Sequence, residues 1–284
     1  MHQAPSLWAF YSHRLHGMWL ATAIGVAVFA VLVLIGYAID RRKLWRWGTS
    51  ASGRHLRTDL GFLLLAPLND TIARSLTTFA VAACAALLGI AVGPHLVDGF
   101  GPISRQPMWL IMLEMLVLGD LGFYWSHRLA HTVPWLWRIH AVHHSTRVMR
   151  WSSAIRVHPA EGWAHLLNAV PLFLLGFPID HLLPVIPLMT AWAWFIHADL
   201  DVDLGPLRCI LNNPAHHRWH HALDVTNGTK NYAGLFPVFD LVFGSYRRPD
   251  QPPDALGIDD NSMPETTLAQ VLYPLRVGDA HRPP

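Results

Sequence analysis

The chain has 284 residues, of which 52% are hydrophobic and only 14% are charged. About a quarter of the residues in an ordinary soluble domain are charged, so this composition argues against one. The net charge of +2 and the lack of a basic stripe with interleaved aromatic residues argue against nucleic-acid binding, and two isolated cysteines exclude a disulfide framework. The unusual feature is the content of 19 histidines and 13 tryptophans.

The first apolar run, Met18–Ile39, contains no charge. About 20 apolar residues cross a bilayer, so the run predicts a membrane helix. A cleaved signal peptide is the alternative, but the run is too long for one and its positive charge follows it. That charge extends from Arg41 to Arg57. By the positive-inside rule this segment faces the cytoplasm, and the N-terminus lies outside.

Two further apolar runs follow before residue 93. Leu60–Leu68 is too short to span and ends at a proline, so we expect it to lie at the interface or to pack under the next helix. Thr71–Val92 is long enough to be the second span. Residues 94–107 contain glycine and proline but few charges, which is typical of an external loop.

Met108–Trp125 is the third span and returns inward. If its helix continues to His131, the 24 residues give about 36 Å of helix, more than the ~30 Å of bilayer hydrocarbon. His127 and His131 therefore emerge on the cytoplasmic side. Glu114 lies inside the span, where a carboxylate indicates either a functional site or a polar partner within the helix bundle.

A second cluster of histidines follows at once. Pro134 suits the first turn of a new helix, which carries His140, His143 and His144. Residues at i, i+3 and i+4 share one face of a helix. Neutral imidazole is a common ligand of transition metals, so this face predicts a metal site.

The third cluster comes after a predicted hairpin. Gly162–Phe177 and His181–Ile196 are two apolar runs that enter the membrane and return, which brings His197 to the cytoplasmic side. Asn213 and Pro214 form an N-cap and first-turn pair. The helix that they start carries His217, His220 and His221.

These histidines exceed what one metal needs, because a typical site uses three or four protein ligands. The pattern therefore predicts two metals. His216 falls roughly 90° from the centre of the last cluster on a helical wheel, so we expect it beside the site or at the surface. His158, in RVHPAE, is a weaker candidate ligand. Asp199 is expected to orient His197 through the second ring nitrogen.

Other functions remain open on these residues alone. A zinc transporter usually places polar residues at the bilayer midplane, whereas these lie at its edge. A structural zinc site needs four ligands, and no GxSxG motif supports a serine hydrolase. A metal-dependent lipid hydrolase or isomerase and a non-enzymatic metal-binding membrane protein both stay possible.

The histidine clusters resemble those of the fatty acid hydroxylase and sterol desaturase superfamily. HRLAH, HAVHH and HHRWHH match its HxxxH, HxxHH and HxxHH boxes, and FIHADL and NYAGLFPVFDLVFGSY are similar to its later segments. The resemblance covers about Leu113 to Arg276. One departure is that Ala193 and Phe195 fill positions where some relatives have a histidine before His197, so His158 or water is left as a tenth ligand.

The resemblance implies a membrane-bound non-haem di-iron enzyme that hydroxylates or desaturates an unactivated C–H bond of a lipid. Its cofactors would be two iron ions (replaceable by zinc on expression), O₂ and an external electron donor. Its partners would be a lipid that enters from the bilayer and a separate electron-transfer protein. Box by box, the resemblance implies these metal ligands: His127, His131, His140, His143, His144, His197, His217, His220 and His221.

Together these patterns predict an all-α integral membrane protein with about four to five membrane helices. A cytoplasmic helical cap would carry the histidine-rich dimetal site. We expect N-terminal membrane helices over residues 1–107, the histidine-box catalytic domain over 108–250 and a Pro-rich C-terminal tail over 251–284.

Overall fold

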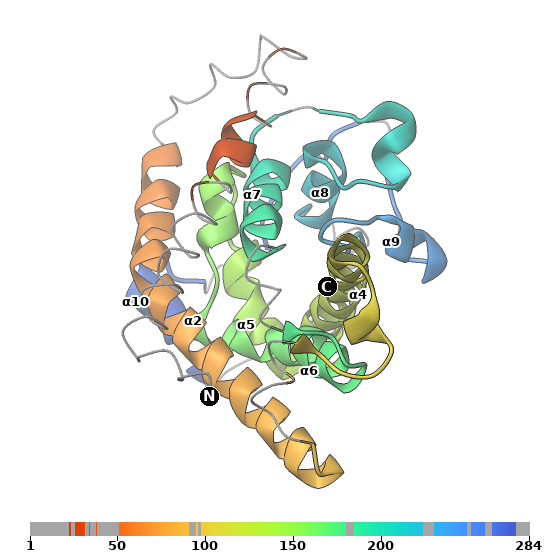
Figure 1. Ribbon diagram of the computed structural model, residues 1–284. Coiled ribbons are helices and arrows are strands. Elements are labelled where there is room, and N and C mark those ends of the chain that lie inside the picture. Colours follow the sequence, from red (N-terminus) through yellow and green to blue (C-terminus); the bar gives the residue numbers. More distant parts are fainter. Residues whose placement is uncertain are drawn as a thin grey trace.

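The computed structural model is helical (Figure 1). It describes residues 51–90, 95, 98–179, 185–200, 202–223, 230–248, 251–258 and 263–276, with scattered positions between 23 and 38. Over these residues it contains no strand, only an isolated bridge between Ala222 and Leu256. The predicted first span, Met18–Ile39, lies largely outside the described residues, as does most of the basic segment that follows it.

Helix α2 extends over 38 residues, Ala51–Leu88, and contains Pro67 (Figure 1). The predicted break between a short interfacial stretch and a separate span was therefore wrong. A proline removes one helical hydrogen bond, but the helix packs on both sides of it. Phe62 before the proline is buried, as is Val81 after it, and this packing outweighs the local preference.

Helix α4, Met108–Thr132, and helix α5, Pro134–His144, form the pair that carries the first two histidine clusters. The predicted extension of α4 to His131 and the predicted start of α5 at Pro134 are both confirmed. A single linking residue, Val133, separates them, and its backbone N–H donates to Leu129 O in the last turn of α4.

Helix α6, Ala164–Leu174, packs on both α4 and α2. It approaches α4 at Gly122, where a Cβ atom would lie 2.5 Å from Leu167 O. Only glycine permits this backbone separation. Helix α7, Val185–His197, is also short. Because residues 180–184 are not described, the hairpin of these two helices stays a prediction.

Short elements complete the fold around the ends of the longer helices. They are η1 Ile103–Arg105, η2 Trp151–Ile155, η3 Pro159–Trp163, η5 Gly205–Cys209, α8 Pro214–His220, α9 Val238–Val242, α10 Thr267–Val271 and η6 Tyr273–Leu275. The C-terminal elements pack on the back of α5, where Trp137, Val142 and Tyr273 share one apolar cluster with Phe62 of α2. Residues 263–276 therefore cover the helix that carries three of the histidines.

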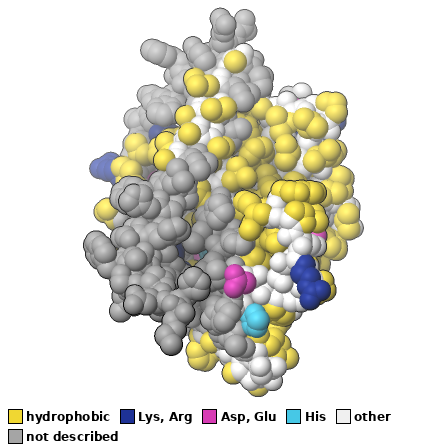
Figure 2. Space-filling view, in the orientation of Figure 1, with side chains coloured by type: hydrophobic (Ala, Val, Ile, Leu, Met, Phe, Trp, Pro, Cys, Tyr) yellow, Lys and Arg dark blue, Asp and Glu magenta, His cyan; other side chains and the backbone are white. Residues whose placement is uncertain are grey.

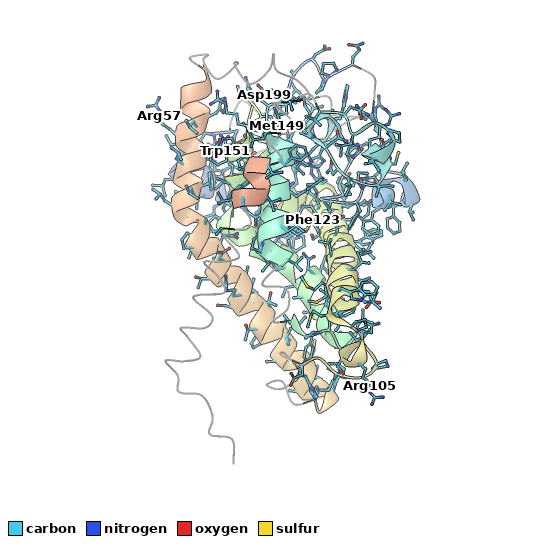
Figure 3. The ribbon with its side chains drawn as sticks, turned by 45° about the horizontal axis from the view of Figure 1, so that its top comes forward. Arg57, Arg105, Phe123, Met149, Trp151 and Asp199 are labelled. Carbon is cyan, nitrogen blue, oxygen red and sulfur yellow. The ribbon has the colours of Figure 1, made fainter. Side chains whose placement is uncertain are left out.

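Two helices, His55–Leu88 and Met108–Thr132, are long and apolar enough to cross a membrane. Many of their apolar side chains face outward; Leu64 is 82% exposed and Phe79 77% exposed. Hydrophobic side chains cover much of the described surface in Figure 2, with few charges among them. Figure 3 shows Arg57 near one end of the long helices and Arg105 near the other. The predicted total of four to five spans stays a prediction.

Candidate metal centre

The structure brings nine histidines together in two adjoining groups, and both groups could hold a metal ion. Within each group the candidate ligand atoms all lie within 4.8 Å of one another. The five-histidine group consists of His127, His131, His140, His144 and His220. The four-histidine group consists of His143, His197, His217 and His221. All nine side chains are buried, and these are the nine positions that the sequence boxes single out.

Four elements and one cap supply these side chains. The end of α4 gives the first pair, α5 gives the triple, the last residue of α7 is His197, and α8 with its C-cap His221 gives the remainder. Asn213 caps α8 as predicted, because its side chain accepts from the His216 N–H, and Pro214 is the first helical residue. The two groups meet where the rings of His144 and His221 stack with centroids 4.3 Å apart.

Backbone carbonyls orient two histidines of the five-histidine group. The Nδ1 atom of His127 donates to Tyr232 O at 2.7 Å, and that of His220 donates to Lys230 O at 2.8 Å. A carbonyl oxygen only accepts, so in each neutral ring Nδ1 carries the proton. The Nε2 lone pair of each ring is then directed away from the carbonyl, where it is free to bind a cation.

A carboxylate orients a third histidine of this group. Glu161, on η3, accepts from Nδ1 of His140. Carboxylates commonly occupy this position behind a metal-binding histidine, since they fix its tautomer and raise its basicity. Glu161 was not predicted from the sequence, although it lies three residues after His158 in the segment RVHPAE.

The four-histidine group is oriented differently. His197 donates through Nδ1 to Ala193 O of its own helix at 2.7 Å, and His143 donates to Arg156 O at 3.2 Å. Both Nε2 atoms are therefore unprotonated in the neutral rings, yet they lie only 3.2 Å apart. Two lone pairs at this separation repel each other unless a cation lies between them.

Several other ring nitrogens in the two groups are buried and have no hydrogen-bond partner. Both nitrogens of His131 and His221 are in this state, as are Nδ1 of His217 and Nε2 of His220. Burying unpartnered polar atoms is costly, and native structures avoid it. A metal ion in each group would supply a partner for one nitrogen of each of these rings. The residues present therefore fit two metals, although nitrogen ligands alone suit zinc, copper, nickel and iron alike.

Burial also keeps these rings neutral. Desolvation lowers the pKa of His143, His144, His217 and His221 well below the usual value for histidine, and the neighbouring imidazoles lower it further. Desolvation lowers the pKa of His220 to about 3, even though the Lys230 carbonyl opposes the shift. Neutral imidazole is the form that binds metal, so at neutral pH a metal ion would not have to displace protons from these histidines.

The two less certain candidates lie outside both groups. His158 has both ring nitrogens engaged, because Nδ1 accepts from Ala160 N at 3.0 Å and Nε2 lies 2.9 Å from Val271 O. It caps η3 and is not free to act as a tenth ligand. His216 is fully buried rather than at the surface, with Nε2 3.8 Å from a carboxylate oxygen of Asp240.

Three acidic residues can be compared with the expectations from the sequence. Asp199 was predicted to orient His197, but it pairs with Arg218 at 3.1 Å. Glu114 accepts from Gln106 at 3.3 Å, which supports the polar-partner alternative for that residue. Asp120 was not singled out, although it too is an acid in the apolar helix α4. It is fully buried and accepts two backbone N–H groups, those of Leu235 and Phe236.

The part of the chain that carries these histidines is similar to known proteins. Residues 112–245, which contain every histidine of both groups, match the fatty acid hydroxylase family. The part of the chain that carries the histidines is therefore similar to this family. The similar proteins include hydroxylases, monooxygenases and desaturases. No solved structure matches the chain at a significant level.

Three of the similar proteins differ in the lipid that their names specify. An ornithine lipid hydroxylase of Rhizobium tropici is 28% identical over 270 residues, which is 94% of this chain and 79% of the relative. An alkylglycerol monooxygenase of Danio rerio is 38% identical over 50% of this chain and 31% of the relative. A Delta(7)-sterol 5(6)-desaturase of Aspergillus fumigatus is 32% identical over 52% of each protein. The chain thus covers less than two thirds of the length of the second and third of these relatives, but more of the first.

Proposed function

We propose that this chain is a membrane-bound oxidoreductase that uses O₂ and two iron ions to hydroxylate or desaturate an unactivated C–H bond of a lipid. The observation that carries the proposal is the pair of facing Nε2 atoms of His143 and His197, 3.2 Å apart. The names of the relatives support lipid oxidation, because they specify an ornithine lipid, an alkylglycerol and a sterol.

The nine histidines would hold one iron in each group. When bound, iron would supply the activation of O₂ that breaks an alkyl C–H bond, which zinc does not perform. The chain's own contribution is to present neutral Nε2 atoms in fixed directions. Tyr232 O and Lys230 O hold two rings in the five-histidine group, and Glu161 holds a third. The same contacts keep the protons on Nδ1, away from the metals.

The reaction also needs groups from outside the chain. Hydroxylation combines the C–H bond with O₂, two electrons and two protons to give an alcohol and one water. Desaturation consumes the same reagents and gives an alkene and two waters. We therefore propose a separate electron-transfer protein as the donor of the two electrons.

We propose that the centre lies at the cytoplasmic edge of the membrane, where a lipid can enter sideways from the bilayer. The two long apolar helices support membrane insertion. Single-cysteine labelling at positions 226 and 104 tests the orientation. The label should reach Thr226→Cys and Ser104→Cys from opposite faces, and labelling of both from one side would contradict it.

The chemistry is tested by comparing lipids of cells that express the wild-type chain or the His217→Ala variant, under air and under anaerobiosis. We expect a product shifted by one oxygen atom or by loss of two hydrogens, formed only by wild type in air. A hydrolase or isomerase would form its product without O₂. A non-enzymatic metal-binding protein would change no lipid, and either result would overturn the proposal.

A further inference from the structure

The loop Lys230–Ala233 accepts hydrogen bonds from two rings of the five-histidine group. Its carbonyls at Lys230 and Tyr232 accept from His220 and His127, which belong to α8 and α4. The two rings come from distant parts of the sequence, yet their centroids lie 4.4 Å apart. One short loop therefore fixes two candidate ligands on two separate helices.

The residue between the two carbonyls has an uncommon backbone conformation. Asn231 has a φ of 61°, and it is the one non-glycine residue with positive φ among those that the structure describes. Asparagine tolerates this left-handed region better than most residues. A positive φ at a buried asparagine requires support from its surroundings, and Asn231 is fully buried.

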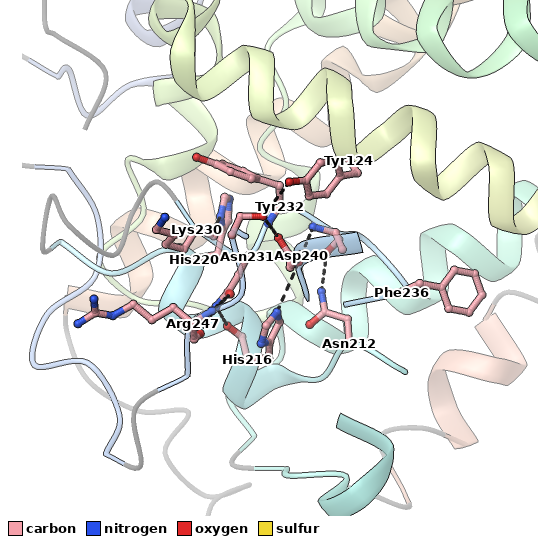
Figure 4. Close-up of polar contacts among 12 residues, drawn as sticks. Tyr124, Asn212, His216, His220, Lys230, Asn231, Tyr232, Phe236, Asp240 and Arg247 are labelled. Atoms are coloured by element: carbon pink, nitrogen blue, oxygen red, sulfur yellow. Dashed lines mark hydrogen bonds and ion pairs between the residues drawn. The ribbon is translucent and has the colours of Figure 1, made fainter. Parts of the chain in front are cut away.

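The side chain of Asn231 supplies that support (Figure 4). Its Nδ2 donates to Arg247 O at 2.6 Å and to His216 O at 3.2 Å, and its Oδ1 accepts from Arg247 N at 2.8 Å. The backbone N–H of Asn231 donates to Ser245 O at 3.0 Å. These bonds tie the loop to both α8 and the chain that follows α9.

Asp240 holds the other half of the loop. Its carboxylate accepts from the backbone N–H groups of Tyr232 at 2.8 Å and Ala233 at 3.1 Å, and from Ser245 Oγ at 2.8 Å. The side chain of Asp240 is fully buried on α9. Because three donors converge on it, the carboxylate determines where the Tyr232 carbonyl lies. Figure 4 shows Asp240 beside Tyr232, on the other side of the loop from Lys230.

We infer that Asn231 and Asp240 are positioning residues for the five-histidine group, acting through the carbonyls of Lys230 and Tyr232. They touch no candidate metal-binding nitrogen themselves. The four-histidine group takes its known acceptors from Ala193 and Arg156 instead. Loss of either positioning residue should therefore weaken one metal site and spare the other. The inference rests on the proposed two-metal function.

Metal binding to the purified full-length chain tests this. Cobalt(II) is titrated into wild type, Asn231→Ala and Asp240→Ala, with cobalt per chain and its visible absorption as readouts. Wild type should bind two equivalents. Each variant should bind one equivalent normally and the other about 10–100-fold more weakly, the range for groups that orient metal ligands.

Three comparisons make the test specific. Asn231→Gly should recover part of the affinity, since glycine keeps positive φ without strain. Asp199→Asn, a carboxylate next to the centre that pairs with Arg218, should behave as wild type. On a His217→Ala background, which disables the four-histidine group, Asn231→Ala should weaken binding of the remaining metal about 10–100-fold. On a His131→Ala background it should have no further effect.

The outcomes distinguish failure of the proposed function from failure of the positioning inference. If wild type binds fewer than two cobalt ions, the proposed function fails. If wild type binds two but Asn231→Ala and Asp240→Ala keep both at normal affinity, the positioning inference fails alone. It also fails if both sites weaken equally in Asn231→Gly while helical circular dichroism is unchanged, because the loop would then lack selectivity.

Discussion

The five-histidine and four-histidine groups adjoin each other but are built in different ways. The first takes its orienting acceptors from outside its own helices, from the loop carbonyls of Lys230 and Tyr232 and from Glu161. The second uses Ala193 of α7 itself and the Arg156 carbonyl. The first group thus takes all these acceptors from outside its own helices, whereas the second takes one of its two from its own helix α7.

Removal of a candidate ligand should produce the largest effect. It should also distinguish His220 from His216, which lies four residues earlier in the chain. His220→Ala removes a member of the five-histidine group, so turnover should be abolished and bound metal should fall to about one ion per chain. His216→Ala should keep most of its metal, because His216 lies outside both groups near Asp240. Metal analysis of both purified variants checks this. Equal metal loss would place His216 among the ligands.

Acid should affect the histidines of both groups, so a fall in pH should not distinguish one group from the other. Burial lowers the pKa of His220 from 6.5 to about 3 in the folded chain, and the pKa of His221 and His143 is also well below normal. Between these values the unfolded chain binds more protons than the folded one, so stability falls as pH falls. Metal-free protein should lose thermal stability from about pH 6.5 downward. A stability that is constant down to pH 4 would contradict this.

Breaking the buried ion pair behind the four-histidine group should cost about 3–5 kcal/mol of unfolding free energy. Asp59 and Arg156 are each 1% exposed, with charged atoms 2.6 Å apart. Asp59→Asn would leave the guanidinium buried without its partner. Denaturant unfolding in detergent measures the loss, and weaker metal binding should accompany it through His143.

An exposed ion pair provides the control for this change. Arg208 and Asp203 have side chains 48% and 41% exposed, and such pairs contribute only about 0–1 kcal/mol. Arg208→Gln should therefore leave stability nearly unchanged. Similar losses in Asp59→Asn and Arg208→Gln would mean that the buried pair does not support the centre.

Changing Glu161 should have the smallest effect of the series. Glu161→Ala removes the acceptor for His140 and should reduce metal affinity or turnover about 10–100-fold. Glu161→Gln keeps an acceptor oxygen but loses the charge, so its loss should be smaller. Metal competition with a chelator measures both. If the two variants lose equal affinity, the charge of Glu161 rather than its hydrogen bond orients His140.

The sequence predicted the helices and the histidines better than the groups that support them. Fixed spacing along a helix places His140, His143 and His144 on one face, so the clusters could be recognised without a structure. Pro134 and Asn213 marked helix starts for equally local reasons. These features depend on neighbours within a few residues.

The supporting contacts could not be read in the same way because they join distant segments. Glu161 meets His140, and Asp120 meets the N–H groups of Leu235 and Phe236, only after the chain has folded. Asp199 was predicted to orient His197 because it follows His197 closely in the sequence, but it forms an ion pair with Arg218 instead. Pro67 misled for the opposite reason: a local helix breaker was overruled by packing along α2.

The apolar cover on the back of α5 sets an order for assembly during synthesis. Tyr273 packs with Trp137 and Val142, and the Val271 carbonyl lies against His158. These residues leave the ribosome after every histidine of both groups. When His221 has just left the ribosome, residues 263–276 have not yet emerged to cover α5. The histidines of α5 are therefore accessible to other metal ions and to other chains until residues 263–276 pack on this helix.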